Sequence, residues 1–313
     1  MARILVSGGA GYKGSVLIPA LIARNHYVTA VDPCWFGNYL PNDPNLILIN
    51  SSVADFCAKD IVMDFDIAII LHSVANDPCS DLDPQLTWDT ACHETAILLR
   101  RLSYTSCRKV IFASSASVYG IRSELDITED LDPVPVSVYN KTKVIAERIV
   151  LSYPVFNPTI LRPATVCGLS PRMRLDTVVN MLSMQALCKK EITVLGGSQY
   201  RPNVHIKDLT EAYLFFIDNL HLCGIYNVGN DTRSVSKIAQ AVRSHIPCDI
   251  VVKSSNDPRS YRLSTNKLIH AGFTYKYNIL SAIKEIADSY NSGNLHDFNQ
   301  WYNIRWMRDV VLK

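Results

Sequence analysis

Short apolar runs alternate with helical segments through the first half of the chain. Each run holds mostly β-branched and aliphatic residues, a pattern typical of strands that are buried on both faces. The predicted strands are residues 4–6, 27–31, 46–49, 67–71 and 109–113. Apolar positions at helical spacing predict helices at residues 15–24, 88–102 and 137–151. The alternation predicts an α/β fold, a doubly wound parallel Rossmann sheet that binds its ligand at the carboxyl ends of its strands.

The second half is expected to complete this sheet and to add a smaller lobe. It holds short strand-like runs at residues 192–195 and 226–229 and helical patterns at residues 177–188, 235–245 and 279–292. We expect residues 1–168 to form the Rossmann domain, with a return segment at about 204–231. Residues 169–203 and 232–313 should form a C-terminal α/β substrate lobe. The tail at 301–313 mixes aromatic and charged residues, which indicates packing or a partner contact and nothing more specific.

Four glycines between the first strand and the first helix predict a phosphate cradle. They stand at positions 8, 9, 11 and 14. Glycines allow the backbone to approach a pyrophosphate, and the helix N-terminus offers free N–H groups. Backbone contacts to a pyrophosphate are expected from Gly8, Gly11, Tyr12, Lys13 and Gly14. A glycine turn alone also serves as a plain structural turn, so its context has to support this interpretation.

That context is the polar residues at the ends of the following strands. Asp32 ends the second strand, where a carboxylate accepts hydrogen bonds from an adenosine ribose and repels a 2′-phosphate. The expected cofactor is therefore NAD rather than NADP. Ser52 and Val53 follow the third strand, where the adenine ring would lie. Further cofactor contacts are expected after the fourth strand, from His72, Ser73, Val74 and Ala75.

Candidate catalytic groups lie at the end of the fifth strand and at the start of the helix after it. Ser115 follows that strand, and Tyr139 and Lys143 stand four positions apart, on one face of the helix. A free tyrosine, with a pKa near 10, is a poor base at neutral pH. A positive charge about 5 Å away is worth roughly 3 kcal/mol at an effective dielectric near 20, so Lys143 and an oxidised nicotinamide ring together are expected to lower the pKa of Tyr139. The alternative is a tyrosine and a lysine on a solvated helix.

Composition excludes several other classes of function. The net charge of +2 over 313 residues indicates neither nucleic acid nor an anionic membrane as a partner. The sequence has no apolar run long enough to span a membrane, and its first strand leaves no room for a signal peptide. Nine scattered cysteines without a C-x-x-C pair favour reduced thiols in a cytoplasmic protein. Neither a metal site nor a disulfide framework is expected.

Taken together, these motifs resemble the extended short-chain dehydrogenase/reductases, in the group of NAD-dependent sugar-nucleotide epimerases and dehydratases. The matching segments are residues 7–14, Asp32, 114–120, 139–143, 161–168, 201–208, 257–261 and Lys267. The resemblance implies that Ser115, Tyr139 and Lys143 are catalytic and that Tyr139 and Lys143 also contact NAD. It further implies cofactor contacts at Pro163 and Val166, and substrate contacts at Asn180, Arg201 and Arg259. Arg172 and Arg174 are further candidates for the diphosphate of the substrate. It also implies a homodimer built on helices 88–102 and 141–151.

The sequence departs from the family pattern at several positions beside the cofactor. Lys13 replaces an apolar residue, and Ser52 replaces the aspartate that usually contacts adenine. Ala91 and Glu94 replace an asparagine and a glycine, and Cys167 replaces a common tyrosine. None of these changes removes a member of the catalytic trio. They leave open whether cofactor affinity or substrate choice has changed.

The residues that follow the fifth strand also limit which reaction the protein is expected to catalyse. Family 4,6-dehydratases carry an acidic pair where this chain has Ala116 and Ser117, which speaks against that reaction. A 4-epimerase acting on a nucleotide-diphosphate sugar is the preferred hypothesis. The first alternative is a 4-dehydrogenase or 4-keto-sugar reductase, for example on a GDP-heptose, because residues 170–176 and 257–261 resemble such a subgroup. The alternative of another class is a non-catalytic NAD-sensing regulator.

Overall fold

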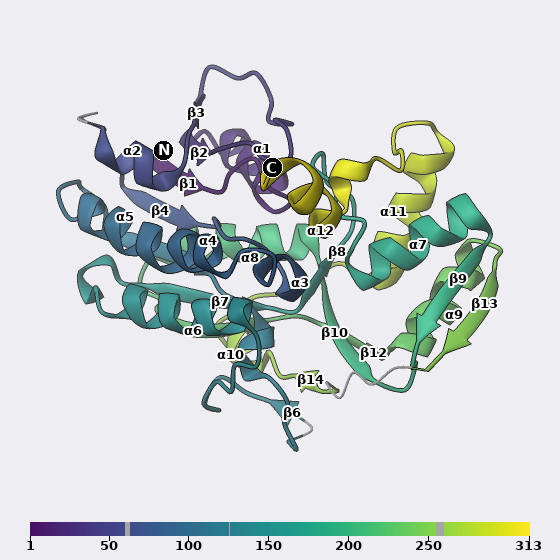
Figure 1. The fold of residues 1–313 in the computed structure, drawn as a ribbon. Coiled ribbons are helices and arrows are strands. Elements are labelled where there is room, and N and C mark those ends of the chain that lie inside the picture. Colours follow the sequence, from purple (N-terminus) through teal and green to yellow (C-terminus); the bar gives the residue numbers. More distant parts are fainter. Residues whose placement is uncertain (60–62, 125, 255–259) are drawn as a thin grey trace.

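The centre of the molecule is a seven-stranded parallel sheet. The computed structural model describes residues 1–59, 63–124, 126–254 and 260–313. The strand order is β11-β7-β5-β4-β1-β2-β3, and all neighbours are parallel (Figure 1). The strands are β1 (Arg3–Ser7), β2 (Tyr27–Asp32), β3 (Leu46–Asn50), β4 (Ile67–Ile70), β5 (Lys109–Ala113), β7 (Thr159–Pro163) and β11 (Gly224–Val228). The predicted doubly wound sheet is confirmed.

Helices cover both faces of this sheet, which explains why its strands are apolar throughout. Alternate residues of β1 enter opposite cores: Ile4 and Val6 pack on one side and Leu5 on the other. The first side is covered by α1 (Gly14–Ala23) and α8 (Ile206–Asp218). The second is covered by α2 (Val53–Ala58), α5 (Glu94–Leu102) and α6 (Val138–Leu151). The order of the strands reverses between β1 and β4, and in such sheets the ligand crevice lies at this point.

A second core lies beside the sheet, on the right in Figure 1. Strand β9 (Glu191–Leu195) pairs with β13 (Asp249–Lys253), beside α7 (Val178–Lys189), α9 (Val235–His245) and α11 (Ile279–Asn291). A three-stranded sheet joins β8 (Thr165–Cys167), β10 (Tyr200–His205) and β12 (Asp231–Ser234), and β6 (Asp126–Ile127) pairs with β14 (Arg262–Leu263). The remaining short helices are α3 (Asp77–Ser80), α4 (Pro84–Trp88), α10 (Asn266–His270) and α12 (Asn303–Trp306).

The predicted helix at 88–102 differs from the structure. It is built from α4, a π-helical turn (Asp89–His93) and α5 in succession. A π-turn has a wider hydrogen-bonding pattern than an α-helix and often occurs at functional sites. Here, Thr90 in the wide turn and Glu94 directly after it both line the main cavity.

Candidate active site

A cavity of about 700 Å³ lies at the carboxyl ends of the sheet strands. Its walls come from the glycine turn, the segment after β4, the serine segment after β5, and the start of α6. The loop before α7, strand β10 and the C-terminal segment complete the enclosure. The cavity thus spans the region between the sheet and the second core.

The glycine turn is as tightly packed as a phosphate cradle requires. A Cβ atom on Gly14 would lie 2.2 Å from the Gly9 carbonyl oxygen, and one on Gly8 would lie 2.5 Å from the His72 nitrogen. Gly8 also has a φ of +74°, a conformation that strains other residues. Side chains at these positions would force the turn open, so the turn fits the dinucleotide expected from the sequence.

Asp32 lies at the end of β2 and lines the cavity. One carboxylate oxygen accepts a hydrogen bond from the Ala10 nitrogen at 3.0 Å, and the other accepts one from the Cys34 nitrogen at 2.7 Å. Burial raises the pKa of this carboxyl, and the two amide bonds oppose that shift. Each carboxylate oxygen retains acceptor capacity for a ribose hydroxyl.

Glu94 also lines the cavity and faces the start of α2. Its carboxylate accepts a long hydrogen bond, 3.4 Å, from the Ala54 nitrogen. Nearby, the Ser52 hydroxyl accepts a bond from the Asp55 nitrogen and donates one to the Asp55 carboxylate, so it caps α2. Burial raises the pKa of Glu94 to about 7; the Ala54 and Val53 amides oppose the shift, and Asp55 and Asp89 add to it.

We predict that the carboxylate of Glu94 destabilises the cofactor-free protein at alkaline pH. The pKa is higher in the folded state than its ordinary value of 4.5, so the folded protein binds more protons between pH 4.5 and about 7. The free energy of unfolding therefore falls as the pH rises through this window. Because Glu94 is only partly buried, we expect Glu94→Gln to gain about 1–2 kcal/mol over wild type at pH 8 and about zero at pH 4.5.

Urea unfolding of both proteins at the two pH values tests this prediction. Glu191→Gln, at an exposed glutamate, is the matched control and should show no pH-dependent gain. A gain for Glu94→Gln that is equal at both pH values would contradict the prediction.

The three predicted catalytic residues come together at the cavity, but not in the same way. Ser115 and Tyr139 line it, whereas Lys143 is buried beneath it and donates a hydrogen bond to the Ala113 oxygen at 2.8 Å. The Lys143 amine lies 5.8 Å from the centre of the Tyr139 ring. The Ser115 hydroxyl lies 2.8 Å from that of Ser117, which donates to the Asn140 carbonyl at 2.6 Å.

Burial and nearby polar groups set the electrostatics around Tyr139. Burial raises its pKa to about 12, and the cation that opposes this shift is Arg174, helped by a hydrogen bond with Ser115. Burial and the nearby Lys13 charge lower the pKa of the Lys143 amine to about 7. The lowering of the Tyr139 pKa by Lys143 and oxidised nicotinamide together stays a prediction; in the structure itself, Arg174 and the Ser115 hydrogen bond are the groups that lower this pKa.

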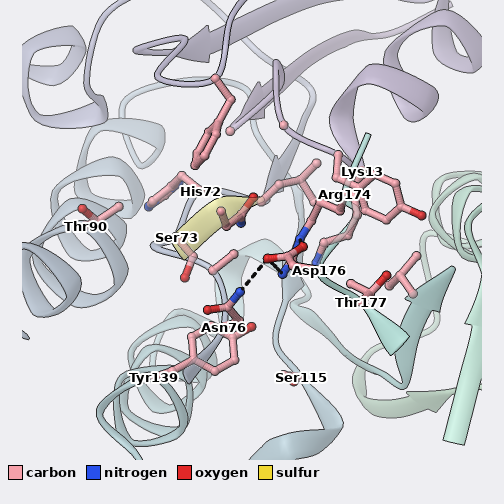
Figure 2. A pocket seen from close by; sticks show the side chains of 18 of the residues that line it. Lys13, His72, Ser73, Asn76, Thr90, Ser115, Tyr139, Arg174, Asp176 and Thr177 are labelled. Carbon is pink, nitrogen blue, oxygen red and sulfur yellow. Dashed lines mark hydrogen bonds and ion pairs between the residues drawn. The ribbon is translucent and has the colours of Figure 1, made fainter. Parts of the chain in front are cut away.

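Arg174, Asp176 and Asn76 form a hydrogen-bonded cluster in the cavity, between Tyr139 and Lys13 (Figure 2). Arg174 makes a two-pronged ion pair with Asp176, with nitrogen–oxygen distances of 2.9 and 3.1 Å, and Asn76 donates to the same carboxylate at 3.1 Å. The ammonium group of Lys13 makes no hydrogen bond or ion pair with any described residue. Burial and the charge of Arg174 lower its pKa to about 8.

Most of the predicted cofactor residues line this one cavity. Those at its surface are Gly8, Gly11, Tyr12, Lys13, Asp32, Ser52, Val53, His72, Ser73, Ala75, Tyr139, Pro163 and Val166. Three others lie behind the surface: Gly14 begins α1, Val74 packs against Met307, and Lys143 supports the floor. Burial lowers the pKa of His72 to about 3, and its two ring nitrogens contact the hydroxyls of Ser7 and Thr95, so this imidazole is neutral.

The predicted substrate residues are more dispersed. Arg201 lines the cavity from β10. Asn180 is fully buried away from the surface, where it accepts from the Gly168 nitrogen and donates to the Tyr12 hydroxyl and the Arg174 oxygen. Arg259 lies outside the described residues.

Several cavity residues were not assigned to the site from the sequence. They are Trp35, Phe36, Asn76, Asp77, Thr90, Asn303 and Ile304. The C-terminal tail, for which only packing or a partner contact was expected, thus forms part of the cavity wall. No local signal identified these residues, because their segments meet only in the folded protein.

Two polar residues at the junction of β10 and α8 support the fold. His205 stacks on Tyr277 with ring centres 4.9 Å apart, and Asp208 accepts from the nitrogens of Lys276 and Tyr277, both at 2.9 Å. In the parts of the chain that the structure describes, no three His, Cys, Asp or Glu side chains are grouped to hold a metal ion. No helix in those parts is both long and apolar enough to cross a membrane.

Comparison with known proteins places this site in a family. Residues 4–229 match the model of the NAD dependent epimerase/dehydratase family. A UDP-glucose 4-epimerase of Corynebacterium glutamicum is 25% identical over 93% of this chain and 96% of its own.

Two solved structures illustrate the structural likeness. A UDP-N-acetylglucosamine 4-epimerase of Methanobrevibacter ruminantium has a TM-score of 0.83 at 20% identity, covering 92% of this chain and 99% of its own. An NAD dependent NDP-hexosamine 5,6-dehydratase has a TM-score of 0.81 at 23% identity, covering 93% and 98%. At this identity the structures show a shared fold. The family match over most of the chain shows more: the chain belongs to the NAD-dependent epimerase/dehydratase family, as an enzyme of the extended short-chain dehydrogenase/reductase type.

Proposed function

We propose that this protein is an NAD-dependent 4-epimerase of a nucleotide-diphosphate sugar. The observation that carries the proposal is that Ser115 and Tyr139 lie in the same cavity as the glycine turn and Asp32. A sugar bound beside Tyr139 would therefore be within reach of a dinucleotide held by the glycine turn. NAD, when bound, accepts a hydride and returns it.

Residues of this chain transfer the proton and hold the substrate. Tyr139 removes the proton of the C4 hydroxyl and later restores it, and Ser115 holds the C4 oxygen. Lys143, fixed by the Ala113 carbonyl, supports the ring of Tyr139 from below. Arg201 is proposed to bind the diphosphate of the substrate, because its planar guanidinium bonds two oxygens at once. Asn180 and Arg259 remain proposed substrate contacts.

The serine segment argues against dehydration through a 4,6-dehydratase mechanism. Ala116 is buried and has no proton to transfer, and Ser117 donates its proton to Asn140. A hydroxyl in this position does not replace the acid and base that water removal needs. Hydride transfer at C4 without loss of water is therefore the favoured chemistry.

A panel of nucleotide-diphosphate sugars separates the candidate functions. We expect interconversion of C4 epimers with less than one equivalent of NAD and no accumulation of NADH. Accumulation of one NADH per product would identify a 4-dehydrogenase, and consumption of NADH would identify a 4-keto-sugar reductase. Tight NAD binding without turnover on any sugar would favour the NAD-sensing regulator. Mass spectrometry of ligands released from freshly purified, denatured protein identifies the sugar to test first.

A homodimer is part of the proposal. Helices α5 and α6 lie side by side on one face of the sheet, as a four-helix interface between two copies requires (Figure 1). Sedimentation should give a dimer at micromolar concentration, and a monomer there would contradict this. We also propose a cytoplasmic location, which all nine unpaired cysteines support.

A further inference from the structure

Arg172 is a buried cation at the wall of the main cavity. Its side chain is 2% exposed, and its guanidinium lies 4.0 Å from the centre of the Phe36 ring. One terminal nitrogen donates to the Asn303 carbonyl oxygen at 2.7 Å, and the other makes a long bond, 3.3 Å, to the Met173 oxygen. The third nitrogen, Nε, is buried and has no hydrogen-bond partner among the described residues.

No described carboxylate neutralises this guanidinium. The nearest acids are already engaged: Asp176 pairs with Arg174, and Asp32 accepts from two backbone amides. Burial and the repulsion of Arg174 lower the pKa of Arg172 to about 9. A buried charge without a counter-ion is unfavourable, and a bound anion would relieve that cost.

The backbone of Arg172 is fixed to the glycine turn. Its nitrogen donates to the Ser15 hydroxyl at 3.3 Å, in the first turn of α1. Two further bonds tie the same loop to this turn: Ser170 donates to the Tyr12 oxygen at 2.9 Å, and the Tyr12 hydroxyl donates to the Gly168 oxygen at 2.7 Å. The loop that carries Arg172 therefore lies against the helix N-terminus that favours a pyrophosphate.

The C-terminal segment holds the other side of the guanidinium. Asn303 is 3% exposed and lines the cavity with Ile304. Trp306 donates from its indole nitrogen to the Trp35 oxygen at 2.6 Å, which joins this segment to the loop that carries Phe36. Three segments far apart in the sequence thus fix one cation at the cavity.

We propose that Arg172 binds the pyrophosphate of NAD, and that Asn303 and Phe36 position it. The loop before α7 and the C-terminal segment then belong to the cofactor site rather than to the substrate site. This inference goes beyond the proposed function: it depends on the NAD site of the family and is independent of the sugar and of the net reaction.

Binding of cofactor fragments to the full-length, cofactor-stripped protein tests the assignment. Arg172→Met should weaken NAD and ADP-ribose about tenfold or more, the scale of a lost charge-assisted hydrogen bond. Adenosine, which lacks phosphate, should bind nearly as it does to wild type, and so should UDP, the nucleoside diphosphate of the 4-epimerases that this chain resembles. Arg172→Lys should retain part of the affinity for ADP-ribose.

Two further variants make the test decisive. Asn303→Ala leaves the guanidinium present but frees it, so it should weaken ADP-ribose by a smaller factor and leave UDP unchanged. Arg305→Met removes an exposed arginine of the same segment and is the matched control. If Arg172→Met does not fold, the binding of ADP-ribose and UDP to Arg172→Lys and Asn303→Ala tests the proposal instead. Weaker binding of UDP alone would assign Arg172 to the substrate and overturn the proposal, as would unchanged binding of ADP-ribose in the variants.

Discussion

Tyr139→Phe is expected to lower kcat by roughly a hundredfold or more, the scale for losing a positioned acid–base group. The substitution keeps the ring, its packing and its place above Lys143, and removes only the hydroxyl. Affinities for NAD and for the sugar nucleotide should therefore change little. A loss confined to kcat would show that the hydroxyl acts in the transition state.

The pH dependence of kcat provides a second, independent test of Tyr139. In the cofactor-free protein, burial holds the pKa of Tyr139 near 12, so the phenol is protonated across the physiological range. The positive charge of oxidised nicotinamide would lower this pKa when NAD binds. The wild-type kcat should therefore rise with pH toward the alkaline side, and Tyr139→Phe should lose that rise.

Steady-state kinetics from pH 6 to about 10 and NAD titration check both points. Tyr27→Phe, at a tyrosine that is 48% exposed at the start of β2, is the matched control and should behave as wild type. Turnover of Tyr139→Phe at the wild-type rate would remove Tyr139 as the acid–base group.

The largest expected effect on stability comes from the ion pair between Glu147 and Arg162. Arg162 Nε lies 2.9 Å from one oxygen of Glu147, and Nη2 lies 2.6 Å from the other. Both side chains are at most 4% exposed. Ser114 donates to the same carboxylate, and the third nitrogen of Arg162 donates to the Tyr119 hydroxyl. This network fixes α6, which carries Tyr139 and Lys143, to the sheet.

Glu147→Ala should lower the free energy of unfolding by about 3–5 kcal/mol, because it leaves the Arg162 charge buried without a partner. Replacing both residues, as in Glu147→Leu with Arg162→Met, should recover much of the loss, since no charge then stays buried. Urea unfolding measures both effects. Glu211→Ala, which removes a surface ion pair with Arg24, should cost at most about 1 kcal/mol. Equal losses for Glu147→Ala and Glu211→Ala would contradict the prediction.

The sequence alone determined the sheet and the centre of the site. Strands buried on both faces appear as short apolar runs, so β1, β2, β3, β4 and β5 were predictable. The glycine turn, Asp32 and Ser115 lie at the ends of strands, and Tyr139 lies at the start of a helix. Parallel strands bring their carboxyl ends to one edge of the sheet, which explains why these residues line one cavity. Strand β13 was not predicted, although residues 250–252 form a short β-branched run of the same kind.

The tertiary structure decided what depends on contacts distant in sequence and on burial. Arg172 is hydrogen-bonded to Asn303 although the two residues are 131 positions apart in the sequence, and no local sequence pattern around either residue predicts this contact. The π-turn before Glu94 was likewise not predicted, because the spacing of apolar residues indicated one continuous helix at 88–102. The charge states of Tyr139 and Lys143 depend on how deeply each group is buried, because desolvation outweighs the attraction of a neighbour four positions away. Residue spacing along a helix specifies which side chains are neighbours, but only the packed protein sets the dielectric environment in which they interact.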